Sequence, residues 1–232
     1  MKTIANLSAI ICAAIAVGSI TPSASAANLV VNGGFENPAD AVPDNDWRYF
    51  GGQNTSGSKY GGPTVEGWEN INETSTIEIR DDKVGKAKEG QHFAEVDSHA
   101  YDKNEPVGFF QDIVTEVGKK YKLSFYFGPR QGYTSQGNDN QLNVSFGSID
   151  EMLDAGVSGV DDAWQLFEGY ITATDTKTRL QFDLQGIPNT LGANLDDIHV
   201  TAVPEPLSVL GLAAIGLLGT AGAVHKRTAT RG

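Results

Sequence analysis

The chain has 232 residues, of which 29 are acidic and 17 basic, and its formal net charge is −12. An acidic surface repels the phosphates of nucleic acids, so nucleic acid is not an expected partner. The single cysteine, Cys12, lies in an N-terminal apolar run. Neither disulfides nor thiol chemistry is therefore expected once that run is removed.

The N-terminus has the pattern of a secretory signal peptide. A lysine at position 2 is followed by an apolar run to Ile20, and Ala24 and Ala26 supply small residues for cleavage after Ala26. We predict that residues 1–26 are a signal peptide and that residues 27–202 form one domain. That segment carries 13 basic and 28 acidic residues, a net charge of −15.

Within residues 27–202, short alternating runs are separated by Gly, Asn, Asp and Pro. In Lys120–Gly128, for example, Leu123, Phe125 and Phe127 fall on one face, and Lys122 and Tyr126 on the other. Such half-buried strands predict an all-β fold with two antiparallel sheets packed as a sandwich. The predicted strands are 29–31, 76–80, 92–97, 107–115, 120–128, 141–147, 165–172, 178–185 and 195–201, with a hairpin turn at 116–119 and a helical turn at 150–154.

Both ends of this segment resemble the ends of galactose-binding-like jelly rolls: Asn28–Glu36 reads NLVVNGGFE, and Leu195–Val200 reads LDDIHV. Trp68 after Gly67, with segments 90–98, 110–112, 118–130 and 189–198, also resembles DUF642-type passenger domains. The resemblance covers nearly all of residues 28–201. It implies a jelly-roll β-sandwich whose two chain ends lie together and frequently share a structural calcium.

The sequence supports a calcium site through its acidic residues. The alternation of the last strand places Asp196 on the side of Ile198 and Val200, toward the interior, and a buried charge needs a partner. Calcium bound by Glu36, Asp196 and Asp197 with backbone carbonyls would provide one. The alternative is that Asp196 and Asp197 cap the strand at a solvated edge or a bulge.

Sugar recognition requires exposed aromatic rings with polar groups beside them. The loops of this segment offer candidate rings, Phe50 and Tyr60 among them, with Asn138 and Asp139 as nearby polar partners. The predicted ligand-binding residues are Trp47, Tyr49, Tyr101, Arg130, Tyr133 and Asn140. The alternative for each ring is packing beneath a long loop. Trp68 and Trp164 are expected in the core.

Catalysis has little support in this sequence. The predicted domain holds three histidines, His92, His99 and His199, and none has the spacing of a metal pair or adjoins a serine motif. Acidic pairs arise by chance among so many carboxylates. We expect a protein that is not an enzyme.

The C-terminus consists of Val203-Pro204-Glu205-Pro206, an uncharged apolar run at 207–224, and the basic residues 225–227. The apolar run is long enough for a transmembrane helix, and the basic end is expected to remain cytoplasmic. This order resembles the PEP-CTERM sorting signal of Gram-negative bacteria, here residues 203–227. The resemblance implies recognition by an exosortase and export to the cell surface or extracellular matrix, whereas an ordinary membrane anchor would lack the processing step.

Taken together, these patterns predict an exported, non-catalytic β-sandwich that binds carbohydrate or exopolysaccharide. The alternative is a structural or adhesive surface protein that acts through calcium and protein partners without binding sugar. Polysaccharide pull-down separates the two hypotheses.

Overall fold

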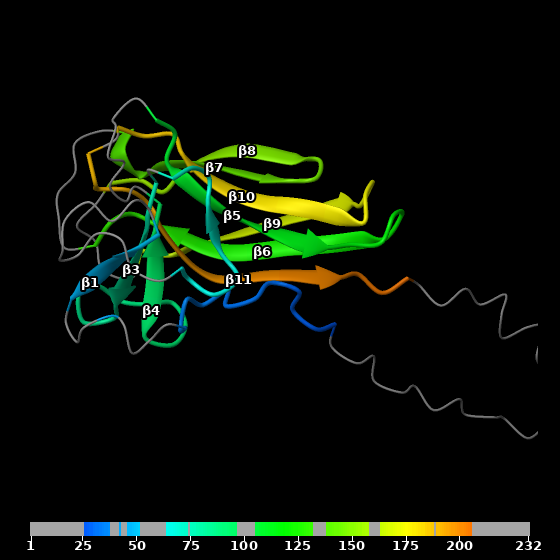
Figure 1. Cartoon of the computed structure of the whole chain (residues 1–232), viewed down its shortest axis with the longest axis horizontal. Helices are drawn as coiled ribbons and strands as arrows, with labels where there is room; N and C mark the ends of the chain where they lie inside the picture. Colours follow the sequence, from blue (N-terminus) through cyan, green and yellow to red (C-terminus); the bar gives the residue numbers. More distant parts are fainter. Residues whose placement is uncertain are drawn as a thin grey trace, which may run out of the picture.

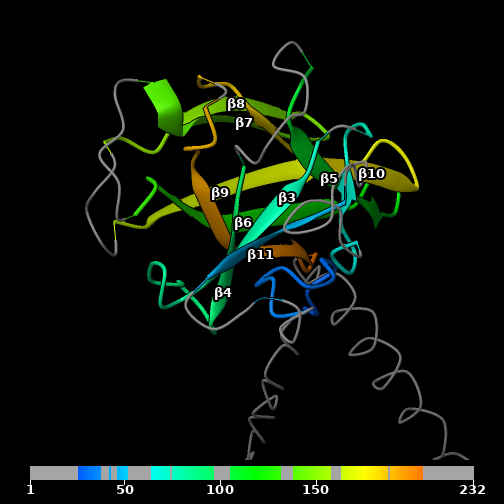
Figure 2. The ribbon, with the colours of Figure 1, turned by 60° about the vertical axis from the view of Figure 1, so that its left-hand side comes forward.

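A computed structural model describes residues 26–37, 42, 46–51, 64–73, 75–96, 105–131, 138–157, 163–187 and 189–205. Two antiparallel sheets face each other in this part of the chain (Figures 1 and 2). Within it, the only helical segment is a 3-10 turn, η2 (Asn138–Asn140). The predicted all-β, two-sheet architecture is therefore confirmed.

Sheet A has the strand order β1-β3-β4-β11-β6-β9 and sheet B the order β2-β5-β10-β7-β8. From β4 onward the chain crosses repeatedly between the sheets, which is the wrapping of a jelly roll. The strands of sheet A are β1 (Trp47–Phe50), β3 (Ile77–Asp81), β4 (His92–Glu95), β11 (Asn194–Ala202), β6 (Lys120–Gly128) and β9 (Gln165–Thr172). Those of sheet B are β2 (Glu69–Asn70), β5 (Gly108–Val114), β10 (Lys177–Leu184), β7 (Gln141–Phe146) and β8 (Ile149–Asp154).

The core lies between the sheets and is rich in aromatic rings. Phe125 of sheet A meets Phe182 of sheet B edge to face, with ring centroids 5.1 Å apart, and Trp68 packs against Phe109 at 5.3 Å. All four side chains are at most 2 % exposed. Trp68 is therefore a core residue, as its sequence context predicts.

The structure corrects the prediction in two strand regions. The expected helical turn at 150–154 is strand β8, because Gly147 adopts a positive φ of 58° and reverses the chain, so that Ile149 pairs with Phe146. The expected strand 29–31 is irregular. There the Asn28 side chain accepts a hydrogen bond from the Val200 amide and donates one to the Ile198 carbonyl, in place of a regular ladder.

The two ends of the sandwich differ in their connections. Strands β1, β4, β6, β8 and β10 all finish at one end, which we call the loop end, because long connections follow each of them. At the opposite end, short turns join β5 to β6, β7 to β8 and β9 to β10 (Figure 1). Strand β11 also finishes there, and the Val203 amide donates to the Lys120 carbonyl.

The predicted sorting motif begins just after this last strand. Pro204 and Glu205 are exposed, while Pro206 and the predicted transmembrane helix at 207–224 lie outside the described residues. The predicted signal peptide lies outside them as well, except for Ala26. Among the residues that the structure describes, no helix is long and apolar enough to cross a membrane.

Candidate functional site

The outer face of sheet A, which points away from the core, combines buried charges with exposed aromatic rings. Cross-strand pairing places its residues in rows, because residues opposite each other in antiparallel strands share a face. One row contains Tyr49, Glu78, Glu95, Asn194 and Gly128, and the next includes Trp47, Arg80, Phe93, Asp196, Tyr126 and Leu166. The half formed by β3 and β4 is covered, and the half formed by β6 and β9 is open.

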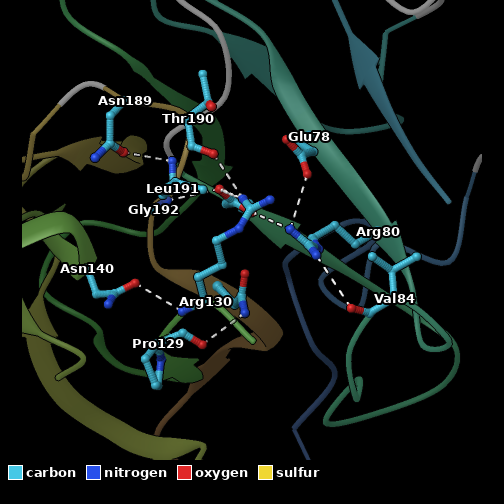
Figure 3. Close-up of polar contacts among 12 residues, drawn as sticks. Glu78, Arg80, Val84, Pro129, Arg130, Asn140, Asn189, Thr190, Leu191 and Gly192 are labelled. Atoms are coloured by element: carbon cyan, nitrogen blue, oxygen red, sulfur yellow. Dashed lines mark hydrogen bonds and ion pairs between the residues drawn. The ribbon is translucent and has the colours of Figure 1, made fainter. Parts of the chain in front are cut away.

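The covered half holds a buried ion network (Figure 3). One Glu95 oxygen lies 2.8 Å from Arg80 Nη1, and the same carboxylate pairs with Arg130. Arg80 Nη1 also lies 3.4 Å from a Glu78 oxygen. The side chains of Glu78, Arg80 and Glu95 are at most 4 % exposed. Glu95 is therefore the shared acceptor of two guanidinium groups.

The pKa of Glu78 in this network is strongly raised. Burial raises the pKa of Glu78 to about 8, and the neighbouring Glu95 carboxylate adds to the effect, although Arg80 and Arg130 oppose it. Glu78 is therefore largely neutral at pH 7. Glu95 accepts hydrogen bonds from both guanidinium groups beside it.

The same network ties the loop end together. Arg130 Nη1 donates to the Thr190 carbonyl at 2.9 Å, and the Gly192 amide donates to Glu95 at 2.9 Å. The Asn140 side chain accepts a hydrogen bond from the Arg130 amide and donates one to the Gly156 carbonyl. These contacts join the segments after β6, β8 and β10, so the cluster supports the loop end.

The β3–β4 connection, residues 82–91, folds over the outer face and borders the open half. Trp164 Nε1 and Gln131 Nε2 both donate to the Lys86 carbonyl, at 2.9 and 3.0 Å. The amides of Lys88 and Glu89 donate to one oxygen of Asp196, at 2.7 and 2.9 Å. Three other parts of the chain therefore hold this connection in place.

The open half is a flat surface of β6, β9 and β11. Tyr170 is 59 % exposed and Leu166 51 % exposed, and Tyr126 is half-buried between them and β11. Polar side chains stand beside these residues. They are Lys122, Ser124, Glu168, His199 and Thr201, with Lys122 paired to Glu168.

The aromatic rings follow the direction of the strands. Trp164 lies against Gly128, where an added Cβ would come within 3.3 Å of the indole, and Tyr126 is two residues away on β6. Tyr170 lies opposite Lys122, four residues further along β6. At about 3.4 Å per residue, the three rings span roughly 20 Å. The surface can therefore contact an extended chain of several units.

The structure corrects the predicted orientation of Asp196. Asp196 pairs with Tyr126 and faces the outer side of sheet A, because the register shifts between Asp196 and His199 and Asp197 has a positive φ of 52°. This β-bulge inserts one residue, so Asp196 and Ile198 no longer share a face. Asp196 is nevertheless fully buried, and burial raises its pKa to about 7. Three hydrogen bonds from backbone amides act in the opposite direction and lower this pKa.

The predicted calcium ligands are only partly brought together. Glu36 and Asp196 both approach Gly34, but Glu36 accepts hydrogen bonds from the amides of Gln91 and His92. Asp197 instead contacts His199 Nε2 at 2.6 Å. Within the described part of the chain, no three His, Cys, Asp or Glu side chains form a group that could hold a metal. Calcium therefore stays a prediction.

The predicted sugar-binding residues lie in several different places. Tyr49 is buried and bonds to Glu78, while Arg130 and Asn140 belong to the network described above. Trp47 starts β1 opposite Arg80 and is half-buried. Tyr101 and Tyr133 lie outside the described residues. The structure thus brings Tyr49, Arg130 and Asn140 to the loop end.

The exposed aromatic residues of sheet A are absent from that predicted set. Trp164, expected in the core, is half-buried on the outer face, where it meets Phe93 edge to face at 5.8 Å. Trp164 precedes β9, so the alternation of residues along that strand did not indicate which face of sheet A its side chain occupies. Tyr126 and Tyr170 could have been found, since each occupies an outward position in an alternating strand.

Comparisons with known proteins give similarity in structure only. No family model and no curated protein sequence matches the chain. A structure described as TmCBM61 in complex with β-1,4-galactotriose is 15 % identical, with a TM-score of 0.41, and the match covers 76 % of this chain and 99 % of that one. A family 16 carbohydrate-binding module is 12 % identical, with a TM-score of 0.42 over 75 % of this chain and 99 % of that one.

A third structure is the CBM22-1 xylan-binding domain from Paenibacillus barcinonensis Xyn10C. It is 12 % identical, with a TM-score of 0.38, over 62 % of this chain and 90 % of that one. Similarity at this level identifies neither a ligand nor a binding residue.

Proposed function

We propose that this chain is an exported, non-catalytic protein that binds polysaccharide on the open half of the outer face of sheet A. The observation that carries the proposal is the line formed by Trp164, Tyr126 and Tyr170 on a solvent-accessible sheet face. Aromatic rings offer flat apolar area to the C–H faces of sugar rings, and the neighbouring hydroxyl, carboxylate and ammonium groups can bind sugar hydroxyls.

Two features of this surface favour binding over catalysis. The buried glutamates Glu78 and Glu95 are at most 1 % exposed, so a glycosidic bond cannot approach them without rearrangement. On the open half, Glu168 pairs with Lys122, and the carboxylate of Asp197 pairs with His199. The surface is therefore suited to holding a chain rather than cleaving it.

The test is binding of the full chain, purified in detergent, to a panel of neutral and acidic polysaccharides by affinity electrophoresis. Tyr126→Ala and Tyr170→Ala should each weaken binding by roughly tenfold, because a sugar ring stacked on a tyrosine ring contributes on the order of 1 kcal/mol or more. Met152→Ala is the matched control, since Met152 is 66 % exposed but lies on sheet B. Unchanged binding in both tyrosine variants would refute the assigned surface.

For delivery, we propose sorting by an exosortase through residues 203–227. The support is the order of the sequence: an extended Val203-Pro204-Glu205-Pro206 motif, an apolar run and a basic end. The two prolines cannot donate backbone hydrogen bonds, which keeps a following helix from extending back through the motif. The exposed position of Pro204 and Glu205 after β11 is compatible with access by a membrane enzyme.

A further inference from the structure

We infer that the polysaccharide bound by sheet A is anionic, a chain that carries carboxylate groups such as uronic acids. The inference rests on the proposed function and concerns the same surface. It starts from the distribution of charge, because a domain of net charge −15 repels an anionic chain unless positive groups are placed where that chain binds.

Three lysines lie at the border of the open half. The β3–β4 connection carries Lys83, Lys86 and Lys88, all exposed, together with Asp82 and Glu89. The Lys88 ammonium lies over the Tyr126 ring, 4.3 Å from its centroid, in a cation–π contact. Neither Lys86 nor Lys88 forms an ion pair with any residue that the structure describes, whereas Lys122 on the sheet is paired with Glu168. The Lys88 ammonium thus stands beside the aromatic line, and the Lys86 backbone lies next to Trp164.

Side chains from other segments hold the backbone of these two lysines in place. Gln131, which is 4 % exposed, bonds to both the amide and the carbonyl of Lys86, and Trp164 bonds to the same carbonyl. The Lys88 amide is fixed by the buried Asp196 carboxyl. Gly85 permits this close packing, since an added Cβ would lie 2.8 Å from the Phe93 ring. The backbone of both lysines is therefore fixed before any ligand arrives, so that only their side chains need to be ordered on binding.

The arrangement suits a sugar acid better than a neutral sugar. A pyranose ring stacked near Tyr126 or Trp164 would bring an equatorial carboxylate at its edge within reach of an ammonium group, and such pairs are charge-assisted hydrogen bonds. A neutral chain would gain the stacking alone. The lysines of the β3–β4 connection thus supply selectivity, while the rings supply contact area.

The experiment compares alginate, a polyuronate, with its neutral propylene glycol ester, using the full chain in detergent. Alginate should bind at least about fivefold more tightly at 0.15 M salt, and the preference should fall at 1 M salt, where the Debye length shrinks from about 8 Å to about 3 Å. Lys86→Gln with Lys88→Gln should remove the preference. The control Lys119→Gln with Lys177→Gln makes the same charge change at the opposite end and should keep it.

The outcomes separate the two proposals. Equal binding of alginate and ester, with both weakened by Tyr126→Ala, would overturn the anionic inference and leave polysaccharide binding in place. Binding of neither polymer, by a chain whose circular dichroism shows folded β-structure, would overturn both. Binding to phosphatidylglycerol vesicles that is lost on Lys86→Gln with Lys88→Gln, without binding to alginate, would identify the basic border as a lipid contact and would also overturn both.

Discussion

Replacing a buried glutamate by glutamine should have opposite effects on stability at two paired positions of sheet A. Glu78 and Glu95 lie opposite each other on β3 and β4, and both are at most 1 % exposed. At pH 7 we expect Glu95→Gln to destabilise the domain and Glu78→Gln to stabilise it. The difference comes from which of the two carries a charge.

For Glu95, the magnitude follows from its partners. Its carboxylate accepts hydrogen bonds from Arg80, Arg130 and the Gly192 amide. The Arg80 side chain is only 4 % exposed, so it cannot recover a full hydration shell when the charge opposite is lost. Removing one partner of a buried ion pair costs roughly 3–5 kcal/mol. Arg130, at 14 % exposure, can turn partly toward water, which favours the lower value of about 3 kcal/mol.

For Glu78, the sign follows from linkage. Its pKa is raised from 4.5 to about 8 in the folded state, so its contribution to stability is fully present below pH 4.5 and is lost as the pH rises through about 8. At pH 7 the free energy of unfolding is therefore already about 3 kcal/mol lower than at acidic pH because of Glu78. Glutamine does not titrate, but its amide reproduces the hydrogen bonds of a neutral carboxylic acid only in part, which costs about 1 kcal/mol. The variant should therefore gain about 2 kcal/mol at pH 7 and nothing near pH 5.

Urea unfolding of residues 27–205, followed by tryptophan fluorescence at pH 5 and pH 7, measures both effects. With a slope of roughly 2 kcal/mol per M urea, the midpoint at pH 7 should move down by about 1.5 M for Glu95→Gln and up by about 1 M for Glu78→Gln. Equal destabilisation by the two substitutions at both pH values would refute the assignment of a neutral Glu78 beside a charged Glu95.

Four further predictions concern other parts of the chain. Gly33→Ala should lower the melting temperature by about 8 °C or more, because its Cβ would lie 2.1 Å from the Ile198 carbonyl oxygen. The corresponding loss of unfolding free energy is about 2–4 kcal/mol. In chelator, raising the pH from 4 to 7 should cost the wild type on the order of 3 kcal/mol relative to Asp196→Asn, since the Asp196 carboxyl ionises above its usual pKa of 3.8 in the unfolded chain but only near 7 in the folded one. If calcium binds there, adding it should raise the melting temperature of the wild type but not of Asp196→Ala; identical melting in calcium and chelator would reject the ion. In the native host, Glu205→Ala with Pro206→Ala should leave the exported protein at full length by intact mass, and wild-type protein that still carries Arg227 would contradict exosortase processing.

The strands could be predicted where one face alone is buried. The alternation of β6 and β9 gives their bounds directly, because inward Phe125 and Phe167 alternate with outward polar residues. Strand β8 could not be found in this way, since Asp150, Glu151 and Met152 are all exposed and only the Gly147 turn reveals it. Local pattern therefore indicates a strand only when the core contacts one of its faces.

The bulge in β11 shows a second limit of strand alternation. Counting by twos along the strand assigns Asp196 to the side of Ile198, whereas Asp197 takes a positive φ, which aspartate tolerates better than most residues. Beside this bulge, the Asp196 side chain accepts hydrogen bonds from Lys88 and Glu89, which are more than 100 residues away in the sequence. Contacts of that separation leave no local pattern.

The candidate site was only partly predictable for a related reason. Outward positions such as Glu78, Arg80 and Glu95 read as solvated charges, but segments distant in sequence cover them, as the contact between Arg130 and the Thr190 carbonyl shows. The open rings at Tyr126 and Tyr170 follow from alternation, whereas the side of Trp164 depends on its hydrogen bond to Lys86.

The neighbouring positions of the first and last described segments of the sandwich affect how it can be joined to other proteins. The Leu29 amide donates to the Val200 carbonyl, so the polypeptide enters and leaves the sandwich at adjacent points. A domain with adjacent ends can be inserted into an exposed loop of a host protein without forcing that loop open. A short linker could likewise join the ends and move the termini to the exposed Val117–Gly118 turn, where an added Cβ on Gly118 meets nothing within 4 Å. The long connections at the far end could then change in length without disturbing the point of attachment.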